Sequence, residues 1–388
     1  MIGQRLRQLR LARGLSLEAL ATAMGGLVTK QAISKYETGK DHPSPVVMNR
    51  MAAALHVKSR ELWAEPQVEV AFVAYRRQAR LPKAEQRRIE SIVTEALEHR
   101  VRLQDLTGQK KTELLVDAFP VNALADAEAA AVSLRKHWRL GLDPIASVIG
   151  ILEDHYVHVV EVDAKDGFDG ISAIARNGGE NKAAAVVTKR GVDGERQRLN
   201  ITHELGHLVC KMGPNVDEEK AAFQFGAAFL APAEVIYREV GAKRHLLQVA
   251  ELLLLKKRFG LSMQALLHRL RDLDVITQSY YASWWPLITK LGWRRREPEA
   301  LKPERPQWLA QTLLRAVSEE LLSIDEAERI LPQVLESTPP LPLVGRRAFL
   351  KLPLDQRRRL MEEQAAKAEA YYRSDLDLGS LGADLADA

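Results

Sequence analysis

Residues 200–210, NITHELGHLVC, place His203 and His207 four positions apart, with Glu204 directly after the first histidine. Four residues complete slightly more than one helical turn, so both imidazoles leave the same face and can bind one metal ion. Zinc held in this way activates a water molecule, and Glu204 is near enough to take its proton and pass it to a leaving amine. The spacing therefore predicts a zinc peptidase centre, with His203 and His207 as ligands and Glu204 as the catalytic residue.

An amphipathic helix with two surface histidines is the alternative interpretation of this stretch. The apolar residues in LGHLV disfavour it, because buried paired histidines need a partner. Asn200 is a candidate N-cap for the predicted helix. Cys210 lies on the same face about one turn beyond His207, where a thiolate could bind zinc, although we favour a buried, small apolar side chain.

A catalytic zinc ion commonly has a third protein ligand, often a carboxylate. The downstream segment DEEKAAFQFGAAFLAP, residues 217–232, is apolar nearly all the way round after its first turn, which predicts a buried helix. Gly226 would let this helix approach the histidine helix closely. Geometry alone does not choose between Glu218 and Glu219 as the third ligand, because both stand at the start of an apolar stripe. At least one of them has the alternative role of stabilising the N-terminus of the helix through its negative charge.

The length and composition of the chain indicate the kind of protein and the cellular compartment to expect. The chain has 388 residues, which suggests two or three domains, and one cysteine, which excludes a disulfide framework and favours a reducing cytoplasm. The N-terminal segment lacks the apolar stretch of a signal peptide, and no apolar run approaches the roughly 20 residues that cross a bilayer. We therefore expect a soluble cytoplasmic protein without a membrane partner.

The positive charge is concentrated at one end of the chain. The first 64 residues contain ten Lys and Arg against four Asp and Glu, whereas the whole chain has a formal charge of only +5. A basic module on a nearly neutral body indicates a polyanionic partner, and a solvated charged surface is the alternative. The same region has helical periodicity throughout, and Ser16, Thr29 and Ser44 are predicted N-caps, with Pro45 at the first position of the fourth helix.

Five short helices with a glycine turn between the second and third fit a helix-turn-helix bundle. The segments LRLARGLSLEALATAMGG and KQAISKYETGK resemble the XRE-type, Cro-like helix-turn-helix family, although MGGLVTKQ is a residue or two longer than the usual turn. The resemblance implies that the helix at 29–38 enters the major groove of double-stranded DNA, where Gln can bind adenine and Lys can bind guanine or phosphate. A helical protein-interaction module is the alternative. The residues expected to contact DNA are Thr29, Lys30, Gln31, Ser34, Lys35 and Lys40.

The segments GERQRLNITHELGHLV and EKAAFQFGAAFLAP resemble the ImmA/IrrE family of zinc metallopeptidases. Carried over position by position, the resemblance implies that Glu219 is the third zinc ligand. The family has Asn or Asp where this chain has Phe223, a change that removes a hydrogen bond next to the zinc ligands. The resemblance also implies cleavage of a partner protein, such as a helix-turn-helix repressor or an antitoxin, in stress-linked or phage-linked control.

The remaining segments complete a mainly α fold with a small β-sheet (α+β). Residues 156–162, 171–176 and 183–189 are predicted strands, and the stretch from Ala84 reads as one long exposed helix. The segment LKKRFGLSMQALLHRL, with Gly260 at a turn and Ser262 as N-cap, is either a second DNA reader or, as we favour, part of a helical lobe of the peptidase. The expected domains are a helix-turn-helix bundle (1–65), a helical linker (66–120), a zincin-like peptidase core (121–300), a C-terminal helical region (301–375) and a disordered acidic tail (376–388).

These observations predict a transcription regulator that joins a DNA-binding module to a zinc endopeptidase. The alternative is a regulator or antitoxin whose metal site is structural or sensory and cleaves nothing. Because a single helix-turn-helix of this size usually needs two copies for useful affinity, we also expect a homodimer.

Overall fold

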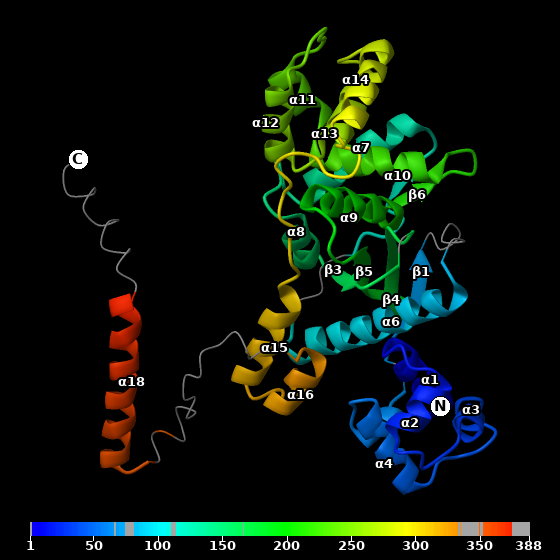
Figure 1. Cartoon of the computed structure of the whole chain (residues 1–388), viewed down its shortest axis with the longest axis vertical. Coiled ribbons are helices and arrows are strands. Elements are labelled where there is room, and N and C mark those ends of the chain that lie inside the picture. The colour runs from blue at the N-terminus through cyan, green and yellow to red at the C-terminus, as the bar shows by residue number, and fades with distance from the viewer. Residues whose placement is uncertain are drawn as a thin grey trace. The chain divides into compact units, whose positions relative to one another are not determined.

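The computed structural model describes residues 2–65, 67–73, 81–109, 114–165, 167–332, 334, 349 and 352–374. By its internal contacts the chain divides into two units, Met1–Ile330 and Leu331–Ala388. The first unit carries a helical bundle, a small mixed sheet and further helices, so the predicted class, mainly α with a small sheet, is confirmed (Figure 1).

The N-terminal bundle consists of five short helices. They are α1 (Ile2–Ala12), α2 (Leu17–Ala23), α3 (Lys30–Glu37), α4 (Pro45–Ala54) and α5 (Ser59–Trp63). The predicted N-caps are confirmed, since Ser16, Thr29 and Ser44 each accept a hydrogen bond from a backbone N–H three residues later. Each cap satisfies a backbone donor that the first helical turn leaves without a partner.

A largely buried ion pair within the bundle joins α1 to α3. Leu6, Leu9 and Ile33 are fully buried in the small apolar core. Beside them Arg10 is only 7% exposed, and its guanidinium donates two hydrogen bonds to the carboxylate of Glu37, one of them at 2.8 Å. Such a bidentate pair holds the helices at a defined angle as well as a defined distance.

The sheet has four strands in the order β1-β4-β5-β3. The strands are β1 (Glu69–Val73), β3 (Val157–Val162), β4 (Gly170–Asn177) and β5 (Glu180–Lys189). β4 pairs antiparallel with β1 and β5, whereas β3 is parallel to β5. Gly178 and Gly179 close the β4–β5 hairpin with φ of +57° and +82°, the backbone conformation of a tight turn that glycine adopts without strain.

The sheet is covered on both faces, so its strands bury alternate side chains in two different cores. Val159 and Val186 belong to the larger core, and Val160 and Val187 to the smaller one. This explains why β3 and β5 are apolar in nearly every position rather than in every second one.

The smaller core contradicts the expectation of an exposed connecting helix. Helix α6 (Lys83–Leu106) buries Ile89, Val93, Leu97 and Val101 against the sheet. Its other side receives α1, because Arg5 pairs with Glu98, and the Arg13 guanidinium donates to Glu95 at 2.8 and 3.0 Å. The apolar positions that recur along α6 thus form the face that packs on the sheet. The prediction that α6 is an exposed helix was wrong, because its polar side is also covered, by α1.

The larger core lies on the other face of the sheet and includes, among others, four helices. These are α7 (Leu124–His137), α8 (Val148–Asp154), α9 (Gly194–Val209) and α10 (Glu218–Leu230). Helix α9 begins at Gly194 with Asp193 as N-cap, six residues before Asn200, so the prediction of Asn200 as the cap was wrong. The short strands β2 (Phe119–Val121) and β6 (Cys210–Met212) pair in parallel just beyond the end of α9.

Four further helices lie together at one end of the first unit, drawn uppermost in Figure 1. They are α11 (Ala233–Val240), α12 (Val249–Phe259), α13 (Met263–Asp272) and α14 (Gln278–Lys290). One of them, α13, contacts α10. The predicted turn between α12 and α13 is confirmed, with Gly260 in the left-handed region and Ser262 capping α13. Leu266, Leu267 and Leu270 of α13 are buried in the larger core, which agrees with a helical lobe of the same domain.

The segment after α14 is tied to the start of α9 by buried polar groups. Lys256 is fully buried and donates to Glu195 at 2.6 Å and to Glu297 at 3.1 Å. The Glu297 carboxylate also accepts the backbone N–H of Met263 at the start of α13, and the backbone N–H of Leu301 donates to Glu195. Helices α15 (Trp308–Ser318) and α16 (Ile324–Ile330) follow this segment and end the first unit.

In the second unit the structure describes one helix with residue bounds, α18 (Leu354–Ser374). The acidic tail expected at 376–388 lies outside the described residues.

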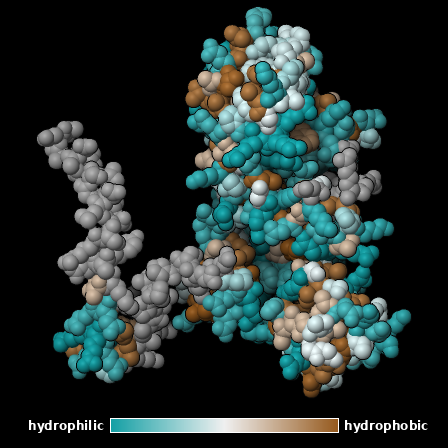
Figure 2. All heavy atoms as spheres, viewed as in Figure 1, coloured by the Kyte–Doolittle hydropathy of each residue, from teal (hydrophilic) through white to brown (hydrophobic). Residues whose placement is uncertain are grey.

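The surface is mainly polar, with separate apolar patches on the face drawn in Figure 2. Large exposed apolar side chains include Leu246 before α12, Leu254 in α12, and Val46 and Trp63 in the N-terminal bundle. Among the helices of the described residues, none has the length and apolar content needed to cross a bilayer.

We expect the buried lysine to be essential for stability. Lys256→Met leaves Glu195 and Glu297 as buried carboxylates without their cation, which should lower the free energy of unfolding by about 3–5 kcal/mol. Lys257→Met is the matched control, because Lys257 is exposed and its pair with Glu299 should contribute less than about 1 kcal/mol. Urea unfolding followed by circular dichroism measures both, and equal losses for the two variants would contradict the assignment.

Candidate metal centre and DNA-facing helix

Helices α9 and α10 pack so closely that a Cβ at either of two glycines would require the neighbouring atoms to shift by a few tenths of an ångström. A Cβ on Gly206 would lie 3.0 Å from the Phe225 ring and 3.3 Å from Ala222, and a Cβ on Gly226 would lie 3.0 Å from the backbone N of His203. The approach that Gly226 suggested in the sequence is therefore present. It brings the first turn of α10 next to the second half of α9.

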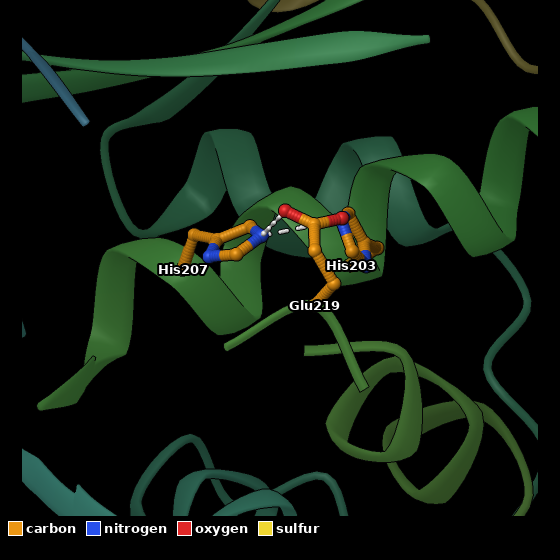
Figure 3. A group of neighbouring side chains, drawn as sticks. All are labelled: His203, His207 and Glu219. Atoms are coloured by element: carbon orange, nitrogen blue, oxygen red, sulfur yellow. Dashed lines mark hydrogen bonds and ion pairs between the residues drawn. The ribbon is translucent and has the colours of Figure 1, made fainter. Parts of the chain in front are cut away.

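This packing assembles three side chains from two helices (Figure 3). The Nε2 atoms of His203 and His207 are 3.2 Å apart, and each lies 3.5 Å from a carboxylate oxygen of Glu219. His203 and His207 are nearly buried, while about a third of the Glu219 side chain is exposed. Among the described residues, these three form a group whose ligand atoms all lie within 4.8 Å of one another.

The spacing of these atoms suits a tetrahedral zinc ion. Ligand atoms held about 2.0–2.2 Å from one such ion lie roughly 3.3–3.5 Å from each other, close to the separations seen here. Burial and, secondarily, the neighbouring His207 lower the pKa of His203 to about 3, so its imidazole is neutral at ordinary pH. A neutral imidazole is the form that binds a metal. Two nitrogens and one oxygen thus form a donor set that zinc prefers.

Glu218 and Glu219 differ in where the helix places them. Both lie in the first turn of α10, but only Glu219 belongs to the group of potential ligands, and Glu218 is exposed. The structure therefore separates the two candidates that the sequence pattern left open.

The Glu204 side chain is almost completely buried and comes from the same helix as the two histidines. Glu204 is 7% exposed, and burial raises its pKa to about 7, with a smaller increase from Asp169 and an opposing hydrogen bond from Ser172. A carboxyl group with a pKa near neutrality can both accept and release a proton, as a general base and acid must.

Two residues around Glu204 have roles that were not assigned from the sequence. The Ser172 hydroxyl lies 2.8 Å from Oε2 of Glu204 and 2.9 Å from its backbone oxygen, so it can donate to either one. Gly170 makes room for the carboxylate, because a Cβ there would lie 2.8 Å from its Cγ. The stretch FDGIS carries both residues, but their contacts with α9 depend on how β4 lies against that helix.

Phe223 covers one side of the group. Its ring centroid is 4.1 Å from that of His203, and 47% of the side chain is exposed. The Nδ1 atom of His203 is buried and has no hydrogen-bond partner among the described residues. Metal-binding histidines usually have such a partner on the second ring nitrogen, so the structure agrees with the loss expected from a Phe at this position.

Cys210 does not join this group of ligands. It is the first residue of β6 rather than part of α9, and it is buried. Burial and, to a smaller extent, Asp117 raise the pKa of its thiol to about 12, so the thiolate form that binds metals is suppressed. The favoured interpretation, a small buried apolar side chain, agrees with this environment.

The residues expected to contact DNA lie in and around α3. Gln31, Lys35 and Lys40 are exposed, as are Thr29 and Lys30, and Ser34 is partly buried. Two of the six have partners within the chain: the Thr29 hydroxyl caps α3, and Lys30 forms an exposed ion pair with Glu18 at 2.6 Å. Gln31 and Lys35 on α3, and Lys40 just after it, are therefore exposed polar residues.

Comparison with family models gives two matches in the chain. Residues 6–62 match the model described as a helix-turn-helix, and residues 175–271 match the model described as an IrrE N-terminal-like domain. The first range covers most of α1 to α5, and the second contains α9 and α10 with all three potential ligands. Both expected resemblances are confirmed, so the chain combines a DNA-binding domain with a peptidase-like domain. No curated protein and no solved structure matches the chain.

The neighbouring glutamates allow a direct test of the ligand set. Glu219→Gln should reduce zinc from about one ion per chain to a small fraction of that, because the amide supplies no negative charge to the ion, whereas Glu218→Gln should retain it. Metal content after dialysis, measured by inductively coupled plasma mass spectrometry, reports the difference. Full zinc in the Glu219 variant, or equal loss in both, would exclude this ligand set.

Proposed function

We propose that this chain is a cytoplasmic, DNA-binding transcription regulator with a zinc-dependent endopeptidase domain that cleaves a partner protein. The observation that carries the proposal is the buried Glu204 carboxylate beside two histidines and a glutamate, within the region that matches a peptidase-like family. By the resemblance, the substrate is a helix-turn-helix repressor or an antitoxin in stress-related or phage-related regulation.

In this proposal His203, His207 and Glu219 hold the zinc ion. When bound, zinc supplies Lewis-acid chemistry, lowering the pKa of a water molecule and polarising the peptide carbonyl. The close packing at Gly206 and Gly226 supports this role, since it keeps ligands from two helices at a fixed separation. Ser172 and Gly170 orient the carboxylate of Glu204, which takes a proton at its Oε atoms and returns it to the leaving amine.

DNA binding in this proposal uses α3 in the major groove. Gln31 and Lys35 read base edges, Lys40 contacts the backbone, and Thr29, Lys30 and Ser34 lie at the edge of the same surface. A homodimer on two half-sites remains a prediction from the size of this module.

One observation favours a second candidate, a regulator or antitoxin whose metal site is structural or sensory. Phe223 packs on His203 where the family has Asn or Asp, and Nδ1 of His203 lacks a partner. A zinc ligand without this support is bound less firmly and tuned less well for catalysis. In that case zinc would stabilise the domain or shift DNA affinity without proteolysis.

Glu204→Gln distinguishes the two functions. The amide cannot act as a base, so cleavage of a partner encoded beside this chain should fall at least a hundredfold, while zinc content and DNA binding stay unchanged. Cleavage is followed by gel electrophoresis of the mixed proteins, with zinc-depleted wild-type chain as the negative control. If the variant has the same cellular effect as the wild type, the proteolytic function is wrong and the sensory one remains.

The DNA-facing residues should separate into two kinds by salt dependence. Gln31→Ala should weaken binding to a selected operator by about 1–3 kcal/mol and relax specificity at one base pair. Lys40→Ala should weaken binding to all sequences and reduce the salt slope by about one. Fluorescence anisotropy at several salt concentrations measures both effects, and unchanged affinity in both variants would place the DNA contacts elsewhere.

A further inference from the structure

A cavity of about 980 Å³ lies beside the proposed metal centre. Its walls come from the first half of α9, from α10 and α13, and from the end of α14 with the segment after it. Arg196 and Leu199 of α9 line it, about two turns and one turn before His203 on the same side of the helix. The cavity thus continues the face of α9 that carries the potential zinc ligands.

Phe223 forms the boundary between the cavity and the metal centre. It lines the cavity, and its ring also packs on the His203 ring at 4.1 Å. A polypeptide segment seated in the cavity would therefore pass Phe223 to reach the group of His203, His207 and Glu219.

The cavity combines aromatic walls with a basic rim. Trp285 and Trp293 line it and are partly exposed, and the Arg294 guanidinium lies 5.8 Å from the Trp285 ring. Arg294 and Arg295 are exposed, and within the described part of the chain neither is paired with a carboxylate. Unpaired guanidinium groups beside aromatic rings can bind carboxylates and stack on planar groups.

Most charged residues of the lining are paired within the chain. Glu195 and Glu297 share the cation of Lys256, and Arg269 is buried against Glu128. Arg196 pairs with Asp169, Lys220 with Asp217, and Arg271 with Asp272. Among the described residues of the lining, Arg294, Arg295 and one acid, Asp193, have no such partner, and the two free guanidinium groups favour a ligand with negative charge.

We propose that the cavity binds an acidic segment of the protein substrate, with apolar side chains against Trp285 and Trp293 and carboxylates on Arg294 and Arg295. This inference rests on the proposed function, because it assigns a substrate class to the same site. A peptide is favoured over a nucleic acid because Phe223 separates the cavity from a centre suited to peptide bonds, and because the cavity has aromatic walls at Trp285 and Trp293.

Binding of a defined peptide to the full chain tests this proposal. The protein is zinc-loaded and carries Glu204→Gln, so that it binds without cleaving. The probe is a short fluorescein-labelled peptide of alternating glutamate and leucine, and lysine replaces glutamate in its counterpart. Arg294→Glu combined with Arg295→Glu should raise the dissociation constant for the acidic peptide about tenfold or more by anisotropy. The control combines Arg296→Glu with Arg305→Glu, two exposed residues outside the cavity lining, and should change it less than twofold.

Several outcomes would overturn the proposal. One is that both double variants weaken binding of the acidic peptide equally, and another is that the lysine peptide binds more tightly than the acidic one. A third is that oligothymidine displaces the acidic peptide, binding with higher affinity in a way that depends on Arg294 and Arg295. The result is separable from the proposed function. If the wild-type chain cleaves no partner but binds the acidic peptide as described, the function fails and the binding site stands. If it cleaves a partner with a KM that the cavity variant leaves unchanged, the binding site fails and the function stands.

Discussion

The close contact of α9 with α10 is the constraint on which the site depends. At Gly206 and Gly226 the two helices approach so closely that a single added methyl group would lie 3.0 Å from atoms of the neighbouring helix. A wider separation would move Glu219 away from both histidines, since its carboxylate reaches them from the first turn of α10. Packing at this distance is rigid, because interiors of close-packed side chains adjust little to added volume.

The sheet supports this contact from one side and connects it to the rest of the unit. β4 places Ser172 and Gly170 against Glu204, while the opposite face of the sheet packs on α6. α6 in turn holds the N-terminal bundle through Arg5 and Arg13. The helix-turn-helix bundle and the candidate metal centre are therefore joined through packed elements of the same unit.

Local patterns predicted the parts of the fold that local chemistry determines. Ser16, Thr29 and Ser44 cap their helices because each hydroxyl accepts a hydrogen bond from a backbone N–H only three residues further along the chain. The spacing of His203 and His207 follows from the helical repeat in the same way. The choice of Glu219 over Glu218 needed either a family resemblance or the packing of α10, since both glutamates lie in one turn.

The features that were missed depend on contacts between distant segments. Asn200 resembles a cap in sequence, but α9 extends about two and a half turns ahead of His203. This extension is possible because the side chains of Glu195 and Gln197 accept hydrogen bonds from the backbone N–H groups of Leu301 and Glu304. The burial of α6 on two sides could not be read from its own residues, because a stripe of apolar positions has the same spacing on an exposed and a covered helix. Ser172 and Lys256 act through partners more than 30 residues away.

The attachment of α1 to α6 changes how much positive charge the N-terminal bundle can present to a phosphate backbone. Arg5 and Arg13 belong to the ten basic residues of the first 64, yet their guanidinium groups are neutralised by Glu98 and Glu95. A bundle separated from α6 would regain both cations and could release about two more counterions from DNA. In the intact chain these two cations are therefore not available for nonspecific attraction to a duplex, and the proposed DNA contacts of α3 would have to supply more of the affinity.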